Sequence, residues 1–319
     1  MTGRMQGKVA LVTGAARGQG RSHAVRLAQE GADIIAVDIC DQIESTPYPM
    51  ATRADLAETG KLVEQLDRRV VTAVADVRER SQLAAAVDAG VAQLGRLDVV
   101  VANAGICPMG LGGPPVAFLD AISVDLVGVI NTVEAAFGHL GAGASIICIG
   151  SMAGLMPGAG DPGSMPGAAG YSHAKRAVAR FTHDLALALA PHSIRVNAIH
   201  PGNINTDMLQ NDAMYKLFRP DLEHPARADA EPAFGAMHKL PVTTLDPADI
   251  SEAVLYFASD AARYVTGQQL KVDAGALLPL TPQEPRLKAP PASQRRAPVP
   301  GLRSDERGTS EERRGKAPG

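Results

Sequence analysis

Tryptophan is absent from the 319-residue sequence and aromatic residues make up only 3% of it, whereas Ala, Val, Leu and Ile are abundant. Strands buried on both faces of a parallel sheet are short continuous runs of such aliphatic residues. The composition therefore favours an α/β protein with a helix-covered parallel sheet. A chain of this length is long enough for one large domain or two small ones.

Cysteine is scarce as well. Cys40, Cys107 and Cys148 lie far apart and none belongs to a C-x-x-C pair. This spacing argues against a disulfide framework and against a zinc site, so we predict no bound metal and a reducing, cytoplasmic location. We find no signal peptide and no apolar run of membrane-spanning length, and we therefore expect a soluble protein without a membrane partner.

Basic residues are not in excess. The formal net charge is −3, which argues against nucleic acid or an anionic membrane as a partner of the folded body.

A glycine-rich stretch follows the first apolar run. Val9–Thr13 leads into Gly14, Gly18 and Gly20, and a helical pattern begins at once. Such glycines let backbone N–H groups approach a pyrophosphate, and the helix N-terminus favours its negative charge. The spacing T-G-x-x-x-G-x-G predicts a dinucleotide-binding loop.

An acidic residue ends the second predicted strand, 34–38, about twenty residues after these glycines. In a dinucleotide fold an acid at this place binds the adenosine ribose hydroxyls and repels a 2′-phosphate. Asp38 therefore favours NAD. Arg17 is the competing signal, since a basic residue there often accompanies NADP. We give Asp38 the greater weight, because its carboxylate would face a phosphate directly.

Strands and helices alternate along most of the chain, which predicts a single Rossmann-type domain with a doubly wound parallel sheet over residues 1–280. Two segments interrupt the alternation. Residues 40–69 form a long insertion after the second strand, and residues 203–245 form an irregular, methionine-containing substrate lid. The Pro-, Arg- and Glu-rich segment 281–319 lacks apolar periodicity, so we predict a disordered tail.

Three polar residues suit acid–base chemistry. Tyr171 and Lys175 lie four apart on a predicted helix and so share a face. A neighbouring ammonium stabilises a phenolate and moves its pKa toward working pH. Ser151 follows the fifth predicted strand and can donate a hydrogen bond to a reacting oxygen.

Together with Asn103-Ala104-Gly105 after the fourth strand, these motifs resemble the short-chain dehydrogenase/reductase family over residues 8–277. The resemblance implies that Tyr171 takes the hydroxyl proton, Lys175 assists it, and Ser151 holds the substrate oxygen. It also implies an NAD site and a homotetramer. The residues expected at the cofactor are Gly14, Arg17, Gly18, Gln19, Gly20, Asp38, Ile39, Asp76, Val77, Asn103, Ala104, Gly105, Tyr171, Lys175, Pro201, Gly202, Ile204 and Thr206.

One position departs from the family. The usual N-L-x-G run, whose Asn carbonyl holds a water linked to the lysine, is Asp125-Leu126-Val127-Gly128 here. Asp125 keeps that carbonyl and is the candidate fourth catalytic residue, although its carboxylate would alter the field at Lys175. Asn131 is no replacement, because six residues along a helix point it elsewhere.

The insertion supports a narrower resemblance. Its residues 47–52 (P-Y-P-M-A-T) and 55–59 resemble the mycofactocin-coupled branch, to which carveol dehydrogenases belong. That resemblance implies tightly held NAD beneath the insertion, oxidation of a weakly polar secondary alcohol, and an external redox carrier of the mycofactocin type.

Two other functions use the same residues or fold. An NAD(H)-dependent ketone or 3-oxoacyl reductase with exchanging cofactor would run the reaction in reverse. An NAD sensor without activity would be expected to lack Tyr171 or Lys175, and both are present.

Overall fold

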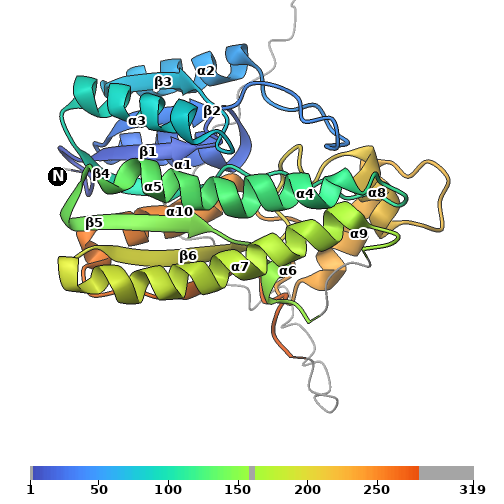
Figure 1. The fold of residues 1–319 in the computed structure, drawn as a ribbon. Coiled ribbons are helices and arrows are strands. Elements are labelled where there is room, and N and C mark those ends of the chain that lie inside the picture. The colour runs from blue at the N-terminus through green and yellow to red at the C-terminus, as the bar shows by residue number, and fades with distance from the viewer. Residues whose placement is uncertain (1–2, 158–161, 280–319) are drawn as a thin grey trace, which may run out of the picture. The chain divides into compact units, whose positions relative to one another are not determined.

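Parallel strands form one seven-stranded sheet in the order β3-β2-β1-β4-β5-β6-β7 within the computed structural model, which describes residues 3–157 and 162–279 (Figure 1). The predicted tail, 281–319, lies outside the described residues. The strands are β1 (Val9–Thr13), β2 (Asp33–Asp38), β3 (Val70–Val74), β4 (Leu97–Ala102), β5 (Leu140–Ile149), β6 (Arg195–Pro201) and β7 (Gln269–Val272).

Both faces of the sheet are buried because the central strands are largely apolar on both sides. Successive side chains of a strand point to opposite faces. In β1, Ala10 and Val12 belong to one buried cluster, whereas Val9 and Leu11 belong to the other. The continuous apolar runs seen in the sequence are thus two interleaved rows, each packed on its own layer of helices.

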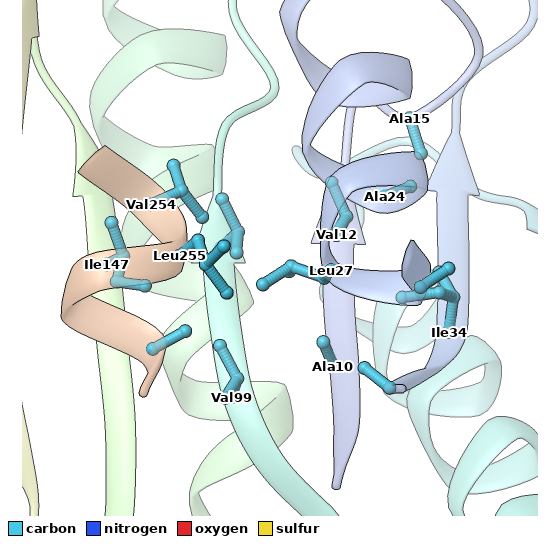
Figure 2. Close-up of a cluster of buried hydrophobic side chains, with 14 of the residues drawn as sticks. Ala10, Val12, Ala15, Ala24, Leu27, Ile34, Val99, Ile147, Val254 and Leu255 are labelled. Atoms are coloured by element: carbon cyan, nitrogen blue, oxygen red, sulfur yellow. The ribbon is translucent and has the colours of Figure 1, made fainter. Parts of the chain in front are cut away.

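Helices cover the two faces. On one face lie α1 (Gly18–Gln29), α2 (Arg53–Glu64) and α10 (Pro247–Ala258), and Figure 2 shows Leu27 of α1 and Leu255 of α10 packed over β1 and β4. The other face carries α3 (Arg80–Leu94), α4 (Val116–Ile122), the π-helix η1 (Ser123–Val127), α5 (Gly128–Phe137) and α7 (Pro166–Leu189) (Figure 1). The short helices are α6 (Met152–Leu155), η2 (Ala190–His192), α8 (Asp212–Phe218), α9 (Arg227–Met237) and η3 (Asp260–Ala262).

The consecutive helices α4, η1 and α5 correct one expectation. Together they make a 22-residue segment, Val116–Phe137, that by length and composition alone could cross a membrane. Half of its most apolar window is buried inside the protein, where α4 packs against α7 and α5 against α3. We therefore interpret the segment as a core element of the α/β fold.

The long helix α7 begins at Pro166, because Pro at the first helical position pre-sets the helical φ angle. The short helix α6 follows Ser151, and the predicted lid contains α8 and α9. The insertion contributes α2, which begins with a capping box between Thr52 and Asp55.

The strand order reverses between β1 and β4, whose following connections diverge to opposite sides of the sheet. Ligands of open α/β sheets bind at the carboxyl ends of the strands beside such a switch point. The functional site is therefore expected at the edge where β1, β4, β5 and β6 end.

Candidate active site

A cavity of about 490 Å³ lies at this edge. Its wall includes every residue that the sequence assigns to catalysis or to the cofactor. The glycine-rich loop, the ends of five strands and the first turns of α7 therefore converge on one space.

Three positions of the glycine-rich loop require glycine, two because of their backbone conformation and one because of lack of space. Gly14 and Gly18 have φ angles of 67° and 54°, in the left-handed region that favours glycine. A Cβ at Gly20 would stand 1.9 Å from the carbonyl oxygen of Gly14. Within the described residues, the buried Oε1 atom of Gln19 has no hydrogen-bond partner. A backbone cradle that closes onto the start of α1 fits a pyrophosphate.

Asn103 fastens this loop to the centre of the sheet. Its side-chain amide donates to the carbonyl oxygen of Thr13 at 2.9 Å, and its backbone N–H donates to the Thr13 hydroxyl at 3.2 Å. The end of β4 is thereby tied to the end of β1 at the switch point.

Asp38 is buried at the tip of β2. One carboxylate oxygen accepts the Ala16 N–H at 3.0 Å and the other accepts the Cys40 N–H at 3.1 Å. The negative charge is thus fixed between the glycine-rich loop and the start of the insertion. Asp76 is held similarly, by the Arg78 guanidinium at 2.6 Å.

Arg17 points across the mouth of the cavity. Its guanidinium donates to the Pro49 carbonyl oxygen at 2.5 Å and forms a 2.9 Å ion pair with Asp207. The side chain therefore joins the insertion to the segment that follows β6.

Tyr171 and Lys175 project from α7 into the cavity, as their spacing predicts. The Lys175 Nζ lies 5.6 Å from the centroid of the Tyr171 ring and donates to the Ile149 carbonyl oxygen at 3.0 Å. Ser151 follows β5 and caps α6, its hydroxyl accepting the Ala153 N–H at 3.1 Å. The Ser151 hydroxyl also hydrogen-bonds the Tyr171 phenol.

The electrostatics of Tyr171 differ from the expectation. Burial raises its pKa well above the ordinary value of 10, with Cys107 and Asp125 adding to the rise, and the Ser151 hydrogen bond opposes them. The Lys175 ammonium does not reverse this rise in the Tyr171 pKa, because a neighbouring carboxylate largely balances its charge.

That carboxylate is Asp125. It lies in the π-helical turn η1 with no exposed surface, and its Oδ1 is 3.0 Å from the Lys175 Nζ. Its Oδ2 accepts the Ile106 N–H at 3.3 Å. A side chain at Gly105 would collide with this carboxylate, since a Cβ there would stand 2.5 Å from Oδ1. Burial raises the Asp125 pKa from 3.8 to about 6, against the opposing effect of Lys175.

Asn131 lies elsewhere, as expected. Its amide donates to the Val77 carbonyl oxygen at 2.9 Å and so supports the loop after β3.

His200 also belongs to the site, although the sequence did not predict it. The ring is fully buried, and its Nε2 lies 2.7 Å from the Oε1 of Gln269, whose own amide donates to Ala179 at 3.1 Å. Nδ1 lies 3.1 Å from the Ser151 carbonyl oxygen and 3.3 Å from the Ser151 backbone nitrogen, so the ring supports the backbone of Ser151. Burial lowers the His200 pKa. A histidine ending β6 was the only signal in the sequence.

The doubly wound sheet, the glycine-rich cradle at its switch point and the Ser–Tyr–Lys group around the same cavity define a Rossmann-type oxidoreductase.

Comparison with known proteins gives the family. A model described as Enoyl-(Acyl carrier protein) reductase matches residues 14–276. The chain belongs to the short-chain dehydrogenase/reductase family. It is 44% identical over 281 residues to (-)-trans-carveol dehydrogenase of Rhodococcus erythropolis, covering 86% of this chain and 99% of that protein.

Two solved structures are similar throughout. Carveol dehydrogenase from Mycobacterium avium in complex with NAD has 51% identity and a TM-score of 0.83, covering 87% of this chain and all of that one. A short chain dehydrogenase from Mycobacterium paratuberculosis bound to NAD has 41% identity and a TM-score of 0.76, covering 86% of this chain and 99% of that one.

The buried Asp125 leads to a prediction about stability. Between pH 4 and pH 6 the folded protein holds the Asp125 proton that the unfolded chain releases, because burial raises the folded pKa. Its stabilising contribution is complete below about pH 4 and is lost as the pH rises through 6. Asp125→Asn removes this loss. The free energy of unfolding of the variant, relative to that of the wild type, should therefore increase as the pH rises from 4 to 7. Urea titration at a series of pH values measures this difference.

The control for that prediction is Glu223→Gln, which removes a carboxylate whose side chain is 91% exposed. Its difference from the wild type should be the same at each pH. A pH-independent difference for Asp125→Asn as well would contradict the raised pKa.

Proposed function

We propose that the protein oxidises a secondary alcohol with NAD, and that Ser151, Tyr171 and Lys175 carry the proton chemistry. The observation that carries the proposal is the convergence of these three side chains and the glycine-rich cradle on one cavity. NAD, when bound, supplies the hydride acceptor.

The protein's own residues handle the substrate oxygen and its proton. Ser151 donates a hydrogen bond to that oxygen, with its backbone held by His200. Tyr171 takes the hydroxyl proton as a phenolate, a form that the Ser151 hydrogen bond favours and that burial opposes. When NAD is bound, Lys175 would also hold the nicotinamide ribose, and Ile204 and Thr206 would hold the carboxamide. Asp125 acts through Lys175 by balancing its charge in a site that solvent hardly reaches.

Replacing Tyr171 with Phe tests this assignment, because the ring stays and the proton-accepting oxygen is lost. Turnover should fall by at least ~100-fold, the effect of losing such a group, while NAD remains bound. The measurement is dye-coupled alcohol oxidation alongside nucleotide content. Near-wild-type turnover would remove Tyr171 from the mechanism.

The cofactor preference is assigned to Asp38. Its fixed carboxylate accepts ribose hydroxyls and repels a 2′-phosphate, whereas Arg17 is occupied by Pro49 and Asp207. The residues expected at the adenine, Asp76 and Val77, line the same end of the cavity.

Asp38→Ala should weaken NAD binding. It should also reduce the ratio of NAD affinity to NADP affinity, because the negative charge that faces the 2′-phosphate is gone. Asp38→Asn separates the two roles of the side chain, since it keeps an acceptor for the loop and loses only the charge. Dissociation constants of the nucleotide-free proteins measure both effects. An unchanged selectivity between NAD and NADP in both variants would contradict the role of Asp38 and would require Arg17 to be reconsidered.

The substrate is a medium-sized, weakly polar, terpenoid-like alcohol. Methionines supply much of the cavity wall away from the cradle, and their flexible side chains adapt to apolar ligands. They are Met109, Met152, Met156, Met165, Met208, Met214 and Met237. The similarity to two carveol dehydrogenases supports the same substrate class.

The insertion 40–69 covers the cofactor and slows its release. Ile43, Tyr48, Met50 and Ala51 line the cavity, and Arg17 joins the insertion to the segment after β6. A closed cover acts mainly on the dissociation rate. The protein is then isolated with nucleotide bound, and a carrier of the mycofactocin type reoxidises it between turnovers.

Supplying alcohol and free NAD without a dye tests the cover. One oxidation per site should occur and then stop, and the nucleotide released on denaturation should be reduced. Steady multiple turnover by protein purified without nucleotide would instead indicate an exchanging dehydrogenase or reductase.

We also propose a cytoplasmic homotetramer. The three cysteines are unpaired, as a reducing compartment allows. Apolar side chains stay exposed on the layer of α4, α5 and α7, among them Val116, Leu119, Phe137 and Leu187. An apolar surface of this kind suits burial between subunits.

A further inference from the structure

The insertion reaches the reaction centre, beyond the adenosine end where it leaves β2. Tyr48 is the single aromatic residue of the insertion and is 5% exposed. Its hydroxyl oxygen accepts the backbone N–H of Cys107 at 3.1 Å. Cys107 lies in the loop after β4 and packs in the same small buried cluster as Tyr171. One hydrogen bond therefore fastens the insertion to the wall beside the catalytic phenol.

The ring of Tyr48 is part of the cavity wall. Tyr48, Cys107, Met109 and Tyr171 all line the cavity. Burial raises the pKa of the Tyr48 phenol, with Cys107 and Asp125 adding to the rise. The hydroxyl thus stays protonated at working pH, and among the described residues it accepts one hydrogen bond and donates none. Its hydrogen remains for a group that enters the cavity.

Other contacts also hold the insertion. Two of them, in its loop before α2, lie away from this point. The Ser45 hydroxyl donates to the Asp120 carboxylate of α4 at 2.7 Å, and Arg17 holds the Pro49 carbonyl oxygen. Ser45 does not line the cavity. Of these contacts, only that of Tyr48 both closes the insertion and shapes the space where an alcohol would lie.

We propose that Tyr48 is the positioning and specificity-determining residue of the insertion: its hydroxyl pins the closed cover to Cys107, and its ring limits the size of alcohol that lies beside Tyr171. The proposal rests on the proposed function. Without the hydroxyl, the buried Cys107 N–H loses its partner in the closed state, which favours opening. Without the ring, the cavity widens on the side of Cys107.

Two substitutions separate these roles. Tyr48→Phe keeps the ring, so release of reduced nucleotide should be about tenfold faster or more while the order of preference among alcohols stays the same. Tyr48→Leu also removes the ring. Tyr48→Leu should release reduced nucleotide at least as fast as Tyr48→Phe. Its KM for bulky alcohols should fall relative to its KM for compact ones. Release is followed by nucleotide fluorescence on the holoenzyme after dilution into an NADH-binding trap, and needs no turnover.

Ser45→Ala is the matched control, because it removes one hydrogen bond from the same insertion without touching the cavity. It should release nucleotide more slowly than Tyr48→Phe and keep the wild-type order of alcohols. Nucleotide release at the wild-type rate in both Tyr48 variants would contradict the role of the Tyr48 hydroxyl in holding the insertion closed. Release from Ser45→Ala as fast as from Tyr48→Phe would contradict it as well. An unchanged order of alcohols in Tyr48→Leu would overturn the size limit. A wild-type holoenzyme that oxidises no alcohol in the dye assay would instead refute the proposed function, and the release measurement would still stand.

Discussion

The ammonium of Lys175 lies 3.0 Å from Asp125 and 3.0 Å from the Ile149 carbonyl oxygen, in a place that solvent hardly reaches. A buried charge is tolerated only when it is paired and hydrogen-bonded. The pairing fixes more than the lysine. It draws η1 against the loop after β4, it requires glycine at position 105, and it sets the field that Tyr171 experiences. The ion pair holds the catalytic helix against the π-helical turn, and the hydrogen bond to Ile149 holds it against the end of β5.

The same contact makes the site unlike the usual family arrangement. Where an asparagine would leave the lysine charge free to act on the phenol, Asp125 balances that charge, and burial then dominates the Tyr171 pKa. The carboxylate itself is only weakly acidic, with a pKa of about 6. Because burial raises this pKa, the balance of charge at Lys175 depends on pH.

The cavity is closed by parts of the chain that are distant in sequence. The glycine-rich loop and Asp38 form one side, and the lid after β6 forms another. The insertion reaches from β2 toward the loop after β4, where Tyr48 meets Cys107. Arg17 connects the insertion and the lid. An arginine that in isolation suggests a phosphate ligand has two partners from the protein, which explains why its presence does not conflict with a preference for NAD.

The sequence alone determined the doubly wound sheet and the places of the glycine-rich loop, Tyr171 and Lys175, because these follow from local patterns: apolar runs of strand length, closely spaced glycines after the first run, and Tyr171 four residues before Lys175 on one helix. Contacts between distant segments were decided only by the tertiary structure. No spacing rule places Asp125 against Lys175 with a carboxylate oxygen 3.0 Å away, His200 behind Ser151, or Tyr48 beside Cys107. The expected lowering of the Tyr171 pKa was wrong for the same reason, since burial and the charges of neighbouring chain segments set a pKa, and neither is encoded in a local motif.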